Sequence, residues 1–168
     1  MRAETLGVPL LVVLLLLSVL VGTALALSPS LTSTPAWRNA RAYNWTLYTQ
    51  GYNENNCLAY AVFNNTMSWI WPWGGSNPTV TQVDGYMVSL GFTPVSPDAT
   101  GPLLTTRACV YGSTSAVGHF AKNRNATLVL RNDLTRAKWG HYEVFNHSNA
   151  NPYKNSPAYG PLVRAYVK

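Results

Sequence analysis

Residues 55–63 read Asn-Asn-Cys-Leu-Ala-Tyr-Ala-Val-Phe, and this stretch carries the strongest structural signal in the chain. Its apolar run, rich in alanine and leucine, predicts a short buried helix over 57–63 with Asn55 or Asn56 as the N-cap. Cys57 then lies at the positive end of the helix dipole, where a thiol loses its proton more readily than in free solution. Two roles are open to this thiol: a nucleophile paired with a histidine, or one half of a disulfide.

The nucleophile hypothesis requires an imidazole that accepts the thiol proton and a third group that orients the imidazole. His119 fits as the base, because a cysteine at a helix start followed by a histidine on a later strand has the order of the papain-like arrangement. For the orienting group the chain offers Asn132 or Asp133, although both also fit a plain turn. The catalytic residues in this hypothesis are Cys57, His119 and Asn132.

Cys109 is the competing partner of Cys57. Two cysteines in an oxidising compartment are expected to form a disulfide. A disulfide that closes a loop of this length stabilises a fold by about 4 kcal/mol in the chain-entropy model. Cys109 lies in a strand that is predicted to pair with the strand of His119. With a Cys57–Cys109 disulfide, the protein is a non-catalytic extracellular binding or structural module.

The rest of the chain predicts an α+β domain, with helices early and strands late. A second helix begins at Thr79 and ends before Gly91, because apolar residues recur at three- and four-residue spacing between them. Strands are predicted over 103–111, 116–121, 126–130 and 162–167.

An aromatic loop over 69–75 separates the two predicted helices. Its three tryptophans, Trp69, Trp71 and Trp73, either wall a substrate cleft or close the edge of the domain. In the hydrolase hypothesis they are the substrate-binding residues.

The N-terminal 26 residues have the character of a secretory signal peptide. An aliphatic run over 8–21 is followed by small residues at Ala24 and Ala26, the two positions that a signal peptidase reads. A membrane anchor formed by the same segment is the alternative. We therefore expect a secreted protein with an extended lead-in over 27–51 and a single domain over 52–168.

Four Asn-x-Ser/Thr sequons are compatible with secretion, and each would be a glycan site in a eukaryotic secretory pathway. They lie at Asn44, Asn64, Asn125 and Asn146.

Charge and motifs exclude several classes of function. The chain has 12 Lys and Arg against 6 Asp and Glu, but its positive residues are scattered, so we expect no nucleic-acid partner. After signal removal no membrane partner is expected. His141, Glu143 and His147 are close in sequence, yet a solvated loop explains them better than a metal site. Phosphate-binding glycine loops are missing from the sequence, and no cofactor is expected.

Short motifs along the chain follow one another in a recognisable order. They occupy 56–61, 69–73, 90–92, 108–111, 118–121, 137–140, His147 and 159–160. The series resembles a mainly bacterial domain-of-unknown-function family, number 7689, with an Asn-Cys-x-Ala-Trp-Ala opening, a Thr-His-Ala strand, a Ser-Lys-Leu-Gly segment and a closing Tyr-Gly. The resemblance runs from about residue 52 to the C-terminus.

That family is similar to papain-like and NlpC/P60-like thiol hydrolases. The resemblance implies a small papain-like domain in which a cysteine-bearing helix packs on an antiparallel sheet, with Cys57 and His119 at the family's cysteine and histidine positions. It implies cleavage of amide bonds in peptides or cell-wall peptidoglycan. Tyr60, Gly118 and Ala137 depart from the family pattern, and Ala137 stands where the family has a serine.

Overall fold

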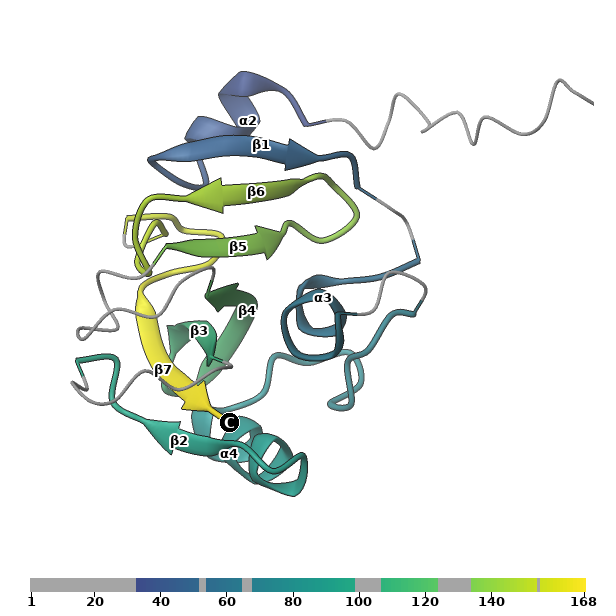
Figure 1. The fold of residues 1–168 in the computed structure, drawn as a ribbon, viewed down its shortest axis with the longest axis vertical. Helices are drawn as coiled ribbons and strands as arrows, with labels where there is room; N and C mark the ends of the chain where they lie inside the picture. The colour runs from purple at the N-terminus through teal and green to yellow at the C-terminus, as the bar shows by residue number, and fades with distance from the viewer. Residues whose placement is uncertain (1–32, 52–53, 65–67, 99–106, 124–133, 154) are drawn as a thin grey trace, which may run out of the picture.

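The computed structural model describes residues 33–51, 54–64, 68–98, 107–123, 134–153 and 155–168 (Figure 1). The predicted signal peptide, the predicted strand over 126–130, the sequon at Asn125, and Asn132 with Asp133 lie outside the described residues. Within the described residues, no helix has the length and apolar character needed to cross a bilayer.

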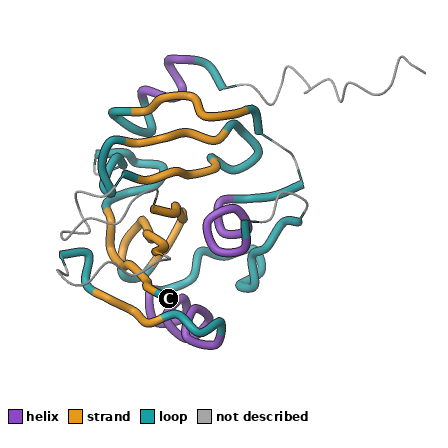
Figure 2. The backbone as a smooth tube through the Cα atoms, in the orientation of Figure 1, coloured by secondary structure: helices purple, strands orange, loops and turns teal. Residues whose placement is uncertain are grey.

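The described part of the chain is an α+β structure, in which three short helices pack on one open antiparallel sheet of seven strands. The strand order is β1-β6-β5-β4-β3-β7-β2 (Figure 1). The strands are β1 (Trp45–Thr49), β2 (Thr93–Val95), β3 (Arg107–Ser113), β4 (Ala116–Asn123), β5 (Thr135–Lys138), β6 (Val144–His147) and β7 (Leu162–Val167). The helices are α2 (Pro35–Asn39), α3 (Cys57–Phe63) and α4 (Val80–Ser89), which lie at separate places around the sheet (Figure 2).

Both helices predicted from the sequence form where their capping residues place them. Asn56 is the N-cap of α3, since its side-chain oxygen accepts a hydrogen bond from the backbone of Ala59 at 3.0 Å. Thr79 caps α4 through a reciprocal capping box with Gln82. Gly91 follows α4 with a φ of +82°, a conformation that favours glycine.

The two faces of the sheet carry separate apolar clusters. Along β3, Val110 packs in the cluster beneath α3 and α4, whereas Cys109 and Tyr111 pack in a cluster rich in aromatic rings. Successive residues of a strand point to opposite faces, so these two clusters lie on opposite sides of the sheet.

The segment over 27–51, expected to be an extended lead-in, is instead partly folded into the domain. Thr34 caps α2 and Pro35 opens it, while β1 pairs with β6 at the edge of the sheet. Threonine and proline suit the first positions of a helix as well as a loop, which explains the incorrect expectation.

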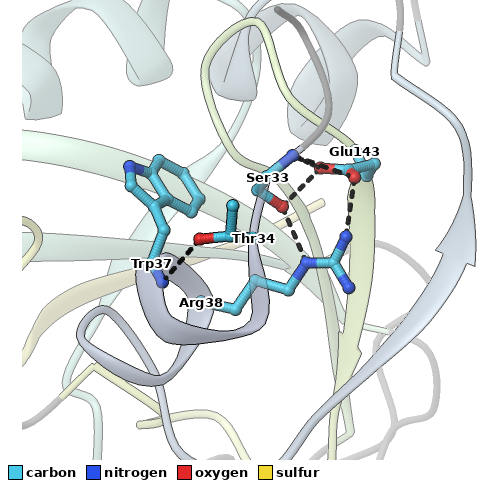
Figure 3. A network of polar contacts seen from close by, with 5 residues as sticks. All are labelled: Ser33, Thr34, Trp37, Arg38 and Glu143. Atoms are coloured by element: carbon cyan, nitrogen blue, oxygen red, sulfur yellow. Dashed lines mark hydrogen bonds and ion pairs between the residues drawn. The ribbon is translucent and has the colours of Figure 1, made fainter. Parts of the chain in front are cut away.

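A buried carboxylate ties this N-terminal segment to the sheet (Figure 3). Glu143, which precedes β6, accepts hydrogen bonds from the backbone and hydroxyl of Ser33 and forms an ion pair with Arg38 at 2.8 Å. Arg38 also donates to the hydroxyl of Ser33 at 2.7 Å. Both oxygens of the buried carboxylate therefore have hydrogen-bond partners inside this cluster.

Candidate functional site

Cys57 lies where two neighbouring strands separate. The pairing of β4 with β5 is confined to two residue pairs, Lys122 with Arg136 and Asn123 with Thr135. Helix α3 contacts both strands beyond that point (Figure 1). The side chain of Cys57 is consequently buried, with 6% of its surface exposed.

The thiol of Cys57 is held in its protonated form. Burial raises its pKa to about 11, although backbone hydrogen bonds from Phe120 and Leu58 and the positive charge of Lys138 act in the opposite direction. The expectation of a readily ionised thiol is therefore wrong for this conformation. The burial penalty exceeds what the helix dipole and nearby amides supply.

His119 precedes Phe120 on β4, but its ring belongs to the aromatic cluster of the other face. It stacks on Tyr159 with ring centroids 4.1 Å apart and meets Tyr153 edge-on at 5.0 Å. Its Nε2 atom is buried and has no hydrogen-bond partner in the part of the chain that the structure describes, and burial holds the pKa of the imidazole well below its usual value. Among the described residues, no hydrogen bond joins His119 to Cys57.

Tyr159 lies close to both groups. Its ring stacks on His119, and its pKa is raised by burial and by the charge that Cys57 would carry as a thiolate. The phenol ring of Tyr159 thus lies near both the His119 imidazole and the Cys57 thiol.

Lys138 is a residue of this site that the sequence interpretation did not single out. It is fully buried on β5, and its ammonium group donates to the carbonyl oxygens of Gly140 at 2.5 Å and Tyr142 at 3.1 Å. Burial lowers its pKa to about 8, while the negative charge of a Cys57 thiolate would raise it. The sequence signal for Lys138 is its place between the apolar Ala137 and Trp139. A charged residue inside a buried strand needs specific partners, so this position indicates a residue with a special role.

The Cys57–Cys109 disulfide is not formed: both cysteines are buried, and neither is bridged to the other. Cys57 packs with the helices, whereas Cys109 packs in the aromatic cluster on the opposite face. The Cys109 thiol donates a hydrogen bond to the side chain of Asn123 at 3.0 Å.

The aromatic loop lies against α3. Asn56, while capping α3, also donates to the carbonyl oxygen of Ile70 at 2.7 Å. Trp71 and Trp73 pack on Phe120 within the domain, whereas Trp69 is half exposed and stacks on His141 at 4.5 Å. Of the three tryptophans, Trp69 therefore presents the most accessible ring.

The other residues considered from the sequence do not converge on one site. Glu143 pairs with Arg38, His147 bonds to Tyr153, and His141 lies on an exposed turn. In the described segments, no three side chains of histidine, cysteine, aspartate or glutamate gather as a metal site would require.

Three of the four sequon asparagines lie in the described residues. Asn44 and Asn64 are exposed and adopt left-handed backbone conformations, with φ of 55° and 52°. Asn146, in contrast, is half-buried in β6, and its side-chain oxygen accepts a hydrogen bond from Arg136 at 2.8 Å.

Comparison with known proteins gives one family. Residues 46–167 match the family described as Domain of unknown function (DUF7689). Neither the curated proteins nor the solved structures contain a significant match to the chain. The matched segment begins inside β1, ends with β7 and includes the whole neighbourhood of Cys57. The chain therefore belongs to the DUF7689 family.

Proposed function

We propose that this protein is a secreted thiol hydrolase with a small papain-like domain, which cleaves amide bonds in peptides or peptidoglycan. Cys57 is the nucleophile and His119 the general base. The observation that carries the proposal is the position of the thiol: it lies against the backbone N–H of Phe120, the residue next to His119 on β4.

The chemistry requires the thiol proton to reach the imidazole before attack. The Nε2 atom of His119 has no partner in the described part of the chain, and in this proposal the imidazole turns from the aromatic cluster toward Cys57 before it accepts that proton. The resulting thiolate attacks the amide carbonyl carbon, and the imidazolium then protonates the departing amine. The ammonium group of Lys138 would offset the charge of the thiolate.

Tyr159 takes the place of an orienting residue in this proposal. A ring stacked on an imidazole restricts its tilt, and Tyr159 is stacked on His119 at an interplanar angle of 22°. Asn132, the orienting residue expected from the sequence, lies outside the described residues.

A non-catalytic extracellular module is the second candidate, and two observations favour it. The thiol is buried and protonated, with a pKa of about 11. In addition, a cavity of about 350 Å³ opens beside β1 and β6, lined by residues such as Trp45 and Asn146 rather than by α3 or β4. In this function Trp69 would supply a ring on which a sugar stacks.

The rate of iodoacetamide alkylation at Cys57, measured from pH 6 to pH 11 on the secreted protein, separates the two functions. For the hydrolase, we expect alkylation with an apparent pKa clearly below 11 and a large loss of rate in His119→Ala. For the module, alkylation follows a midpoint near 11 and is indifferent to His119→Ala. A Cys109→Ala background assigns the signal to Cys57.

Hydrolysis supplies the second readout. Release of amine from peptides or from muropeptides is expected to fall by at least about 10³-fold in Cys57→Ala. Equal turnover by the wild-type protein and Cys57→Ala would contradict the proposed nucleophile.

A further inference from the structure

Two cations face each other directly on neighbouring strands. Lys122 of β4 pairs in register with Arg136 of β5. Like charges in directly opposed positions repel and destabilise a sheet. Such a pair is therefore unexpected unless something else offsets its charge.

The described residues do not offset it. Lys122 donates to the amide oxygen of Asn64 at 2.5 Å, and Arg136 donates to the amide oxygen of Asn146 at 2.8 Å. Both acceptors are neutral, and in the described part of the chain neither cation has a carboxylate partner. The repulsion also has a measurable consequence, because burial and the charge of Arg136 lower the pKa of Lys122.

Tyrosine rings fix both cations in place. The ammonium nitrogen of Lys122 lies 4.2 Å from the ring centroid of Tyr60, and the guanidinium carbon of Arg136 lies 3.3 Å from that of Tyr48. Cation–π contacts of this kind position a charge without neutralising it. The two cations are partly exposed and the Lys122–Asn64 hydrogen bond is at the surface, whereas Tyr60 is buried behind Lys122.

The pair lies along the same helix as Cys57. On α3, Tyr60 follows Cys57 by three residues and therefore lies on the same side of the helix, about 4.5 Å further along its axis. On β5, Arg136 and Lys138 are two residues apart and share a face. Lys138 interacts electrostatically with Cys57, and Arg136 with Tyr60. The Lys138–Cys57 and Arg136–Tyr60 interactions are thus neighbours where α3 packs on β5.

We propose that Lys122, Arg136 and Tyr60 form a binding site for a carboxylate group of a ligand. A carboxylate bound there would accept hydrogen bonds from the ammonium and guanidinium groups and would offset two mutually repelling charges. A hydrogen bond from a cation to a carboxylate is stronger than one from the same cation to a neutral amide oxygen, which is the acceptor that each cation now contacts. The assignment of this carboxylate to the peptide cleaved at Cys57 rests on the proposed function; the binding site itself does not.

Succinate binding, followed by thermal unfolding at pH 7.5 and constant ionic strength, tests the proposal. The Cys57→Ala protein is used, so that the result is independent of hydrolysis. We expect saturating succinate to raise the Tm by about 5 °C and sodium chloride at matched ionic strength to leave it unchanged. Carbon–proton NMR of the lysine side chains is expected to show a rise in the pKa of Lys122 on binding.

Variants assign the binding to this pair. Lys122→Gln and Arg136→Gln are each expected to weaken succinate binding by about tenfold or more, because each removes one charge-assisted hydrogen bond. Both are expected to fold, since each removes the repulsion across the strands. Lys168→Gln is the matched control, because Lys168 also lies over an aromatic ring, that of Phe92. This variant is expected to bind succinate as the parent protein does.

Two results would overturn the proposal. One is a succinate shift of equal size in wild-type and Lys122→Gln/Arg136→Gln proteins. The other is tighter binding of inorganic phosphate than of succinate, which would contradict the carboxylate class. Neither result bears on alkylation or turnover at Cys57, so failure of the carboxylate site is distinguishable from failure of the hydrolase proposal.

Discussion

Lowering the pH from 7 to 5 is expected to reduce the free energy of unfolding by about 2 kcal/mol or more, because two histidines are buried in their neutral form. Burial lowers the pKa of His147 to about 3 and holds that of His119 well below its usual value. In the unfolded chain both titrate near 6.5. Between 6.5 and its folded pKa, a histidine loses about 1.4 kcal/mol of stabilisation per pH unit, which for His147 is about 2 kcal/mol at pH 5. The lowered pKa of His119 changes the stability in the same direction.

The sign of the effect at His147 follows from its hydrogen bonds. The indole of Trp139 only donates, and it donates to the hydroxyl of Tyr153 at 2.8 Å. In the tautomer of His147 in which Nε2 carries no proton, Tyr153 donates its own proton to that nitrogen, also at 2.8 Å. An imidazolium carries a proton on both nitrogens and can no longer accept this bond, so protonation opposes folding.

Urea unfolding at pH 7, 6 and 5 checks this expectation. His147→Gln keeps an acceptor for Tyr153 and is expected to lose the share of the pH dependence that His147 contributes, about 2 kcal/mol between pH 7 and pH 5. His141→Gln is the matched control, because it removes a histidine from an exposed turn outside both clusters. The same pH slope in the wild-type and His147→Gln proteins would contradict the argument.

The elements predicted correctly are those with local signals. Helix α3 with Asn56, one of its two candidate caps, helix α4 with its start at Thr79, and strand β7 follow from signals that lie within or beside each element. The β3–β4 hairpin was predicted in the same way. Strands β2, β5 and β6 were missed because three or four residues carry too little periodicity to mark a strand without its partner.

The site was predictable in its order along the chain but not in its electrostatics. The sequence placed Cys57 at the start of a helix, which the structure confirms, and His119 on a strand, which it also confirms. A helix dipole is worth about 1 kcal/mol at a partly exposed site, whereas the burial that controls the Cys57 thiol depends on strands far along the chain. The opposition of Lys122 and Arg136 likewise depends on strand register, which composition does not specify.

Replacing Glu143 with alanine is expected to destabilise the fold by about 3–5 kcal/mol, because it leaves a half-buried network without its central acceptor. Glu143 is 1% exposed and accepts from the backbone and hydroxyl of Ser33 and from Arg38 (Figure 3). Alanine accepts none of these bonds, and the guanidinium of Arg38 then lacks its counter-charge against the rings of Trp45 and Phe145. Urea unfolding at pH 7 measures the loss.

Asp84→Ala is the matched control, because Asp84 also pairs with an arginine, Arg164, but at a more exposed position. An accessible pair contributes about 1 kcal/mol or less, although Asp84 also accepts from Tyr166. Equal losses in Glu143→Ala and Asp84→Ala would contradict the role assigned to burial. In the double variant Arg38→Met/Glu143→Leu neither charge stays buried, so part of the lost stability is expected to return.

The same network decides whether the N-terminal segment unfolds with the domain or before it. Ser33 and Arg38 contact the sheet through Glu143, and β1 follows them at the edge of the sheet. If Glu143 holds only this segment, Glu143→Ala is expected to expose 33–49 to proteases while the urea midpoint stays near the wild-type value. A lower midpoint with unchanged protease resistance at neutral pH instead shows that α2, β1 and the rest of the sheet unfold as one cooperative unit, as a carboxylate shared between the segment and the turn before β6 predicts.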